Sequence, residues 1–388
     1  MPKNILPRSK NGEYVGKQIG NMILTGTQES SRREHLPSSS NNDKKEATTI
    51  EVAKGKTVGG SILTGTQGSG GDGSTRVAHQ KETKPIEIDG RDSIYAVAFL
   101  ADGKHVVSGG DEGKMRRWRV GDGRGVGGPV DVESPIVNIA VSQDEKWVVI
   151  GAHSGLVTVW NAESHEKVTE LKAHNDRVRA VDVSPDVTRI ATGSRDKTVC
   201  VWSLSSGECL LGPLKYDHWV VAVKFSPDGR LIATATWNRD VQVYDSRNAA
   251  LVSDFPVQVN SAINQSLAWA SDSKRLFALS RDGNINCLDV STGTTLSKWA
   301  IHSSHNPRCI ALASNGTFIA ASTNSSISFW DAGMREQIGS VIKHSRVIWS
   351  MAISANYDLV ISGRKTITLL GLCDILPSRY LDNVCGPA

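Results

Sequence analysis

The stretch HNDRVRAVDVSPDVTRIATGSRDKTVCVW, residues 174–202, contains three runs of the kind that form β-strands. The first run, VRAVDV, contains three valines in a strand-like sequence and is followed by SPD, which is typical of a tight turn. The runs RIATG and TVCVW follow, separated by the polar turn SRDK, and the last is rich in β-branched residues. After Trp202, the segment LSSGECLL supplies another turn and a short fourth strand. Four short strands joined by turns predict an antiparallel sheet and exclude alternation of strands with helices.

The aromatic residue that closes this stretch recurs along the chain. Trp118, Trp160, Trp202 and Tyr244 lie 42 residues apart, and the series continues less strictly through Leu288, Trp330 and Leu370. The strand pattern recurs in seven units, at residues 94–118, 136–160, 174–202, 220–245, 266–289, 309–331 and 348–370. A period of about 40–45 residues with a closing aromatic indicates a four-stranded propeller blade. We therefore predict an all-β, seven-bladed propeller.

These units resemble WD40 repeats. The aspartate that follows the aromatic in that family is present here as Asp245, Asp289 and Asp331. The resemblance covers residues 85–372 and implies a seven-bladed WD40 β-propeller that serves as a platform for partners. Segments such as SPDGRLIATAT and SRDKTVCVWSLSSGE also resemble the WD40 arrays of filamentous fungi, including those of vegetative-incompatibility-type proteins. That further likeness implies a recognition or sensor module.

The resemblance also implies structural roles for polar and aromatic residues of the blades. In the third unit, a hydrogen-bond relay typical of WD40 blades would join His174, one of Thr192 or Ser194, Asp196 and Trp202. Histidine and aspartate also occur in catalytic triads, but a blade has to pair its buried polar groups, which favours the structural role. We expect the repeated aromatics to wedge between blades. These aromatics are Trp118, Trp160, Trp202, Tyr244 and Trp330.

The segments outside the repeats differ in composition from the repeats. Residues 1–84 are poor in aromatics and rich in Ser, Asn, Gly, Lys and Thr, so they cannot bury enough apolar area to offset ordering and are predicted to be disordered. The hexapeptide ILTGTQ occurs twice in this segment, at 23–28 and 62–67. A duplication in a low-complexity segment and a bivalent motif for one partner are both open. Residues 373–388 are predicted to be a C-terminal tail.

The ring has to be closed, because an open edge strand invites aggregation. No paired strand is evident after Leu372, whereas Lys84–Asp89 is extended in character and precedes the first unit. We predict that this segment forms the outermost strand of the last blade and joins the two ends of the repeat region.

Composition limits the location and the partners. The chain has 388 residues and a net charge of +4, of which residues 1–84 carry +5, with 13 Lys and Arg against 8 Asp and Glu. The repeat region is therefore nearly neutral, which argues against nucleic-acid binding. No apolar run is long enough to span a membrane, and the N-terminus has no secretory apolar region. The six cysteines contain no CxxC pair. Cys200 and Cys287 lie in third strands, where a thiol is expected to act as a small hydrophobe, and disulfide bonding or zinc binding is the less favoured alternative. We predict an intracellular protein, cytoplasmic or nuclear.

Motifs that carry chemistry are not found. The triplet Gly55-Lys56-Thr57 resembles the end of a P-loop, but Ile50 stands where its first glycine belongs. The chain has no GxSxG nucleophile elbow and no HExxH motif. We predict no catalytic residues, no cofactor and no metal site, and favour a non-catalytic protein-interaction scaffold. The alternative is a propeller-type hydrolase that uses acids and histidines in the central channel.

The repeat geometry places a candidate binding surface. The loop before the first strand of a unit and the turn after its second strand lie on one face, which we call the top face. The residues expected to bind a partner there are Arg177, Arg179, Arg195, His218, Trp219, Trp237, Arg281 and Arg308. Arg and Trp are enriched in interface hot spots, and Arg binds carboxylate or phosphate in a bidentate manner. The prediction is an acidic or phosphorylated peptide partner of a monomeric propeller within a larger complex. Alternatively, the tryptophans pack between loops and the arginines are merely solvated.

Overall fold

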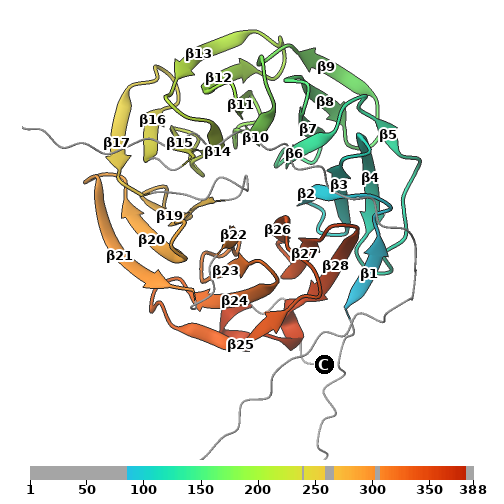
Figure 1. The fold of residues 1–388 in the computed structure, drawn as a ribbon, viewed down its shortest axis with the longest axis vertical. Helices are drawn as coiled ribbons and strands as arrows, with labels where there is room; N and C mark the ends of the chain where they lie inside the picture. The colour runs from blue at the N-terminus through green and yellow to red at the C-terminus, as the bar shows by residue number, and fades with distance from the viewer. Residues whose placement is uncertain (1–84, 238–239, 258–265, 302–305, 382–388) are drawn as a thin grey trace, which may run out of the picture. The chain divides into compact units, whose positions relative to one another are not determined.

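A computed structural model describes residues 85–237, 240–257, 266–301 and 306–381. The chain divides into two compact units, residues 1–47 and residues 48–388, and every described residue belongs to the second. The described residues form 28 strands in seven four-stranded antiparallel sheets, which surround a common axis (Figure 1). The predicted seven-bladed propeller is therefore confirmed. The predicted disorder of residues 1–84 and the two ILTGTQ copies lie outside the described residues.

The first four blades follow the order of the chain, each from its innermost to its outermost strand (Figure 1). Blade 1 comprises β2 (Ile94–Phe99), β3 (His105–Gly110), β4 (Lys114–Arg119) and β5 (Val130–Asp131). Blade 2 comprises β6 (Ile136–Val141), β7 (Trp147–Ala152), β8 (Val157–Asn161) and β9 (Lys167–Leu171). Blade 3 comprises β10 (Val178–Val183), β11 (Arg189–Ser194), β12 (Thr198–Ser203) and β13 (Cys209–Lys215). Blade 4 comprises β14 (Val220–Phe225), β15 (Leu231–Thr236), β16 (Val241–Asp245) and β17 (Leu251–Phe255).

The remaining three blades include the one that closes the ring. Blade 5 comprises β18 (Leu267–Trp269), β19 (Arg275–Leu279), β20 (Asn284–Asp289) and β21 (Thr294–Ala300). Blade 6 comprises β22 (Pro307–Leu312), β23 (Phe318–Thr323), β24 (Ser326–Asp331) and β25 (Gln337–Lys343). Blade 7 comprises β26 (Ser350–Ile353), β27 (Asp358–Ser362), β28 (Thr366–Gly371) and, as its outermost strand, β1 (Ile86–Asp89).

Neighbouring blades pack through apolar side chains that leave no room for a side chain at one repeated position. A Cβ atom added to any of three glycines spaced 42 residues apart would lie 2.6 to 2.7 Å from the first residue of the next blade's innermost strand. These glycine and partner pairs are Gly109 with Ile136, Gly151 with Val178 and Gly193 with Val220. Glycine at this position lets the blades approach closely, because any larger side chain would meet a fully buried aliphatic one.

The predicted closure of the ring is confirmed. Strand β1 pairs antiparallel with β28, in a register that places Ile86 opposite Leu369 and Ile88 opposite Ile367. Ile88 is 5% exposed and packs in the apolar cluster between blades 7 and 1. The last blade is thus completed by the segment that precedes the first one.

Residues that follow β28 pack against the ring. The 3-10 helices η1 (Leu372–Asp374) and η2 (Ser378–Tyr380) place Leu376 and Tyr380 in the apolar cluster between blades 6 and 7. The Tyr380 hydroxyl donates a hydrogen bond to Asp331 Oδ2 at 2.9 Å. Cys200 and Cys287 are free and buried, as expected, whereas Cys373 is disulfide-bonded, which was the less favoured alternative.

Candidate functional site

The hydrogen-bond relay implied for blade 3 is present, and Thr192 is its central residue. Thr192 Oγ1 accepts a hydrogen bond from Trp202 Nε1 at 3.0 Å and lies 2.8 Å from His174 Nε2. On the other side of the imidazole, His174 Nδ1 lies 3.0 Å from Asp196 Oδ2. Ser194 is not the relay hydroxyl, because its side chain donates instead to the carbonyl oxygen of Asp176. The four-residue relay ties the outer part of the blade to the loop on its top face.

Burial decides the protonation state of the relay. The His174 side chain is fully buried, and burial lowers the pKa of its imidazole, while the neighbouring Asp196 opposes that shift. Burial alone would raise the pKa of Asp196, but hydrogen bonds from Thr198 and from the Asn175 amide, with the nearby His174, lower it. A neutral imidazole next to a carboxylate implies that Nδ1 carries the proton and that Nε2 accepts from the Thr192 hydroxyl. Every polar atom of the relay then has a partner.

This arrangement predicts a dependence of stability on pH. As the pH falls below about 6.5, the unfolded chain binds a proton at His174 that the folded state refuses until its lower pKa is reached. The free energy of unfolding should therefore fall with pH in that window, by at most about 1.4 kcal/mol per pH unit for this one group. Urea unfolding of the wild type and of His174→Gln between pH 7 and pH 5 measures the slope.

The variant should show the smaller slope. His153 and His165 also have pKa values lowered by burial and contribute in the same direction in both proteins, so only the difference between the slopes reports His174. His218→Gln, outside the relay, serves as the matched control. Identical slopes for the wild type and His174→Gln would contradict a neutral buried imidazole.

The other indoles that close the third strands find a hydroxyl in one of two places. Trp118 Nε1 donates to Ser108 Oγ at 2.8 Å, ten residues upstream, as Trp202 does to Thr192. Where that upstream position is apolar, the hydroxyl lies two residues upstream instead. Trp160 donates to Thr158 at 2.8 Å, and Trp330 donates to Ser328 at 2.9 Å. In blade 4, where tyrosine replaces tryptophan, the Tyr244 hydroxyl donates to Gln242 Oε1 at 2.8 Å.

The loops of the top face are hydrogen-bonded to one another as the repeat geometry requires. The amide of Arg195, after β11, donates to the carbonyl oxygen of Arg177, before β10, at 2.9 Å. The amide of Trp237, after β15, donates to the carbonyl oxygen of Trp219, before β14, at 2.9 Å. Equivalent loops of neighbouring blades therefore present their side chains on one surface.

Two of these loops meet in a stack of an arginine and two indoles. The rings of Trp219 and Trp237 are stacked with centroids 4.5 Å apart, and the Arg195 guanidinium lies 4.2 Å from the centroid of the Trp219 ring. Arg195 is thus held in place by a cation–π contact. Its Nε also lies 3.7 Å from Asp176 Oδ2.

Three arginines converge at this stack. Burial, followed by the charges of Arg177 and Arg195, lowers the pKa of Arg179 to about 10, and Asp176 only partly opposes this. Burial is the largest cause of this shift, and the smaller contributions show that Arg179 has two arginines and one carboxylate near it. We call the five residues Arg177, Arg179, Arg195, Trp219 and Trp237 the blade 3–4 cluster.

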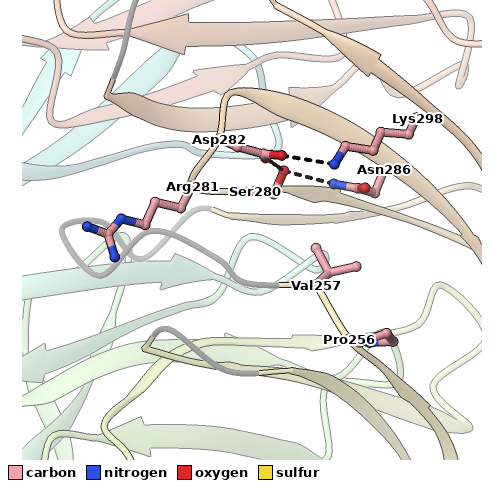
Figure 2. Close-up of a pocket in the computed structure, with 7 residues that line it drawn as sticks. All are labelled: Pro256, Val257, Ser280, Arg281, Asp282, Asn286 and Lys298. Atoms are coloured by element: carbon pink, nitrogen blue, oxygen red, sulfur yellow. Dashed lines mark hydrogen bonds and ion pairs between the residues drawn. The ribbon is translucent and has the colours of Figure 1, made fainter.

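The structure does not bring the remaining candidates into this cluster. His218 lies beside Trp219 in the chain and is partly exposed. Arg281 lines a pocket of about 520 Å³ between blades 4 and 5, and its side chain points away from the group formed by Ser280, Asp282, Asn286 and Lys298 (Figure 2). Arg308 instead lies 5.3 Å from the centroid of the Trp349 ring, at the junction of blades 6 and 7.

Trp349 is a top-face residue that the sequence interpretation missed. Each of the first four blades has a β-bulge beside the second residue of its innermost strand, occupied by Tyr95, Val137, Arg179 and Val221. Those residues follow a buried aliphatic residue, and Trp349 likewise follows the buried Ile348. Aligning the units on that aliphatic position would have placed Trp349 on the top face with Tyr95.

Within the described ranges, no group of three or more His, Cys, Asp and Glu side chains is placed to hold a metal ion. The same ranges contain no helix with the length and apolar character needed to cross a membrane.

Comparison with protein families gives two matches. Residues 135–371, more than half of the chain, match the family described as the IFT122 first beta-propeller. Residues 83–119 match the WD domain, G-beta repeat. No curated protein matches the chain. The further likeness to fungal vegetative-incompatibility arrays finds no support in either match.

Proposed function

The chain belongs to the family described as the IFT122 first beta-propeller, a propeller of WD40 repeats, and from this premise we propose that it is a non-catalytic scaffold whose blade 3–4 cluster binds an acidic or phosphorylated segment of a partner protein. A ring of this kind acts as a monomeric module within a larger complex, where it recognises its partner through the loops of the top face.

The observation that carries this proposal is the stacked Arg195 among three arginines. A guanidinium fixed on Trp219 keeps its N–H edges for a ligand and loses little conformational freedom on binding. The neighbouring Arg177 and Arg179 add positive charge that Asp176 balances only in part. A carboxylate or phosphate placed here would relieve the repulsion among the guanidiniums and form charge-assisted hydrogen bonds.

The alternative, a hydrolase centred on the channel, requires acids and histidines near the ring axis. The innermost strands surround that axis (Figure 1). The second positions of the innermost repeat segments in blades 1, 2, 3, 4, 6 and 7 are Tyr95, Val137, Arg179, Val221, Arg308 and Trp349. No carboxylate and no imidazole stands among these six side chains. Asp182, a carboxylate elsewhere on the innermost strand β10, is already bound by Lys224 of β14 at 2.8 Å, which favours binding over hydrolysis.

The proposal is tested by substituting three residues of the blade 3–4 cluster and comparing the variant with a charge-matched control. In the variant Arg177→Gln, Arg195→Gln, Trp219→Ala, the affinity for glutamate-rich or phosphoserine peptides should fall by at least about thirtyfold, the effect of losing one hot-spot residue. The control variant, Arg124→Gln with Arg230→Gln, removes the same charge from two exposed arginines elsewhere on the ring. Fluorescence anisotropy measures binding, and circular dichroism confirms folding. Full retention of affinity by the folded triple variant would refute the proposal.

A further inference from the structure

A second pocket opens on the top face, between blades 7 and 1. Its volume is about 550 Å³, and it is lined by Tyr95 and Asp111 of blade 1 and by Arg346, Val347, Trp349 and Arg364 of blade 7. The lining residues lie in or beside the loops before the innermost strands and after the second strands. The pocket therefore belongs to the same face as the blade 3–4 cluster. Blade 2 lies between them in one direction along the chain, and blades 5 and 6 lie between them in the other.

The aromatic wall of the pocket is rigid before any ligand arrives. The rings of Tyr95 and Trp349 meet edge to face with centroids 5.5 Å apart, and the Tyr95 hydroxyl donates to Asp111 Oδ2 at 2.8 Å. Arg308 contacts the Trp349 ring and donates from Nε to Asn324 Oδ1 at 3.2 Å. A wall already fixed by these contacts loses little side-chain freedom when a ligand binds.

Positive charge is concentrated on the blade 6–7 side of the pocket. The described residues of the top-face loops of blades 6 and 7, Ile301, 306–307, 324–325, 344–349 and 363–365, contain no Asp or Glu. The Arg and Lys residues in or beside them are Arg308, Lys343, Arg346, Arg364 and Lys365, and none of these has a carboxylate of the described ranges within ion-pair distance.

The carboxylates on the blade 1 side already have partners. Asp111 accepts the Tyr95 hydroxyl, and Glu112 is held by Arg116 at 2.6 Å and by Lys114 at 3.2 Å. Asp111 keeps its negative charge, because the Tyr95 hydroxyl is neutral, so Arg346 and Arg364 face one carboxylate across the pocket. The lining therefore has a net positive charge on its blade 7 side, which would attract a ligand carboxylate.

An exposed aliphatic side chain lies beside these arginines. Val347 is 36% exposed. The other large apolar side chains that the described ranges leave exposed lie on outermost strands or in the turn after β24, away from the top face. These are Val168, Leu210, Leu251, Val252, Leu296 and Met334. Apolar area next to unbalanced arginines suits a ligand that presents an apolar side chain beside a carboxylate.

We propose that this pocket is a second peptide-binding site, which takes an apolar residue flanked by Asp or Glu in an acidic segment of a protein partner. The inference rests on the proposed function, because it assigns a second contact on the same face to the same class of partner. A cavity of this size exceeds what one carboxylate needs and accommodates a leucine or aromatic side chain as well. Two sites on one face allow a single partner segment to bind both, with a gain in overall affinity.

The test uses the full chain and three synthetic peptides, EELEELEE, QQLQQLQQ and EEGEEGEE, measured by isothermal titration. Arg346→Gln with Arg364→Gln should weaken EELEELEE at least about tenfold, as loss of a contributing interface charge does. Val347→Ser should weaken EELEELEE but not EEGEEGEE, because only the former contains leucine. The charge-matched control is again Arg124→Gln with Arg230→Gln, which should leave binding unchanged.

The outcomes separate this inference from the proposed function. If only the blade 3–4 triple variant loses affinity for EELEELEE, the pocket proposal is overturned and the proposed function stands. If only the Arg346 and Arg364 variant loses affinity, the pocket stands and the blade 3–4 assignment fails. Failure of the wild type to bind EELEELEE at millimolar concentration overturns the pocket. The pocket proposal is also overturned, in favour of a nucleic-acid ligand, if an oligothymidylate binds at least as tightly as EELEELEE and loses affinity in the Arg346 and Arg364 variant.

Discussion

Removal of residues 1–91 is expected to abolish the cooperative thermal transition of the propeller, whereas removal of residues 1–78 should leave it unchanged. The longer truncation deletes β1 and with it the outermost strand of blade 7. Ile86 and Ile88 then leave an apolar cluster that includes Trp118 of blade 1 and Leu369 of β28. Loss of two such isoleucines costs about 2–5 kcal/mol each, before the lost strand pairing is counted, against a typical total stability of about 5–15 kcal/mol.

A point substitution tests the contribution of β1 without shortening the chain. Ile88→Asp places a charge at a position that is 5% exposed, whereas Glu87→Gln changes an exposed residue of the same strand. The first should lower the melting temperature strongly and the second should not, as measured by circular dichroism with size-exclusion chromatography to detect association through the β28 edge. Equal melting of the two truncations would show that β1 is dispensable for closure.

Closure was predictable because it depends on a count of strands. The last unit supplies three strands before the repeats end, and Lys84–Asp89 is an extended segment without a unit of its own. Blade number was predictable for a related reason. A closing aromatic must meet the neighbouring blade once per repeat, so Trp118, Trp160 and Trp202 keep the period even where the rest of the unit varies.

The polar partner of each indole was less predictable, because two positions can supply it. A hydroxyl ten residues upstream lies across the β-ladder from the indole's strand, and one two residues upstream lies on the same strand and face. Either hydroxyl can accept a hydrogen bond from the indole nitrogen, so a blade needs a hydroxyl at only one of the two positions. In blade 3, Thr192 and Ser194 share a face of β11, and only the structure shows that Ser194 faces the Asp176 carbonyl instead.

The placement of the candidate binding residues was partly predictable. Arg177, Arg195 and Trp219 follow from the regular spacing of blades 2 to 4, where positions can be transferred by counting. In blades 5 to 7 the interval changes, because Leu288 lies 44 residues after Tyr244 and Leu370 lies 40 residues after Trp330, so counting fails. The grouping of Arg308 with Trp349 depends on packing between two irregular blades, and that information is not carried by spacing.

Replacement of Trp160 by alanine is expected to destabilise the propeller by about 3–5 kcal/mol, the cost of removing a buried large aromatic side chain. Trp160 is 6% exposed and packs between blades 1 and 2 with Ile139 and Val148. Its loss opens a cavity between two sheets and leaves the Thr158 hydroxyl without its indole donor. Urea unfolding at pH 7 measures the change.

Two further variants divide that cost between packing and hydrogen bonding. Trp160→Phe keeps most of the ring but removes the N–H donor, and Thr158→Val keeps the shape of the partner but removes the acceptor, so that the buried indole N–H is unsatisfied. Each should cost about 1–3 kcal/mol. If the bond is the shared cause, the double variant should cost less than the sum of the two single variants, because the second change removes a group already without its partner. Additive costs would show that Trp160 stabilises the ring through packing alone and that Thr158 acts independently of it.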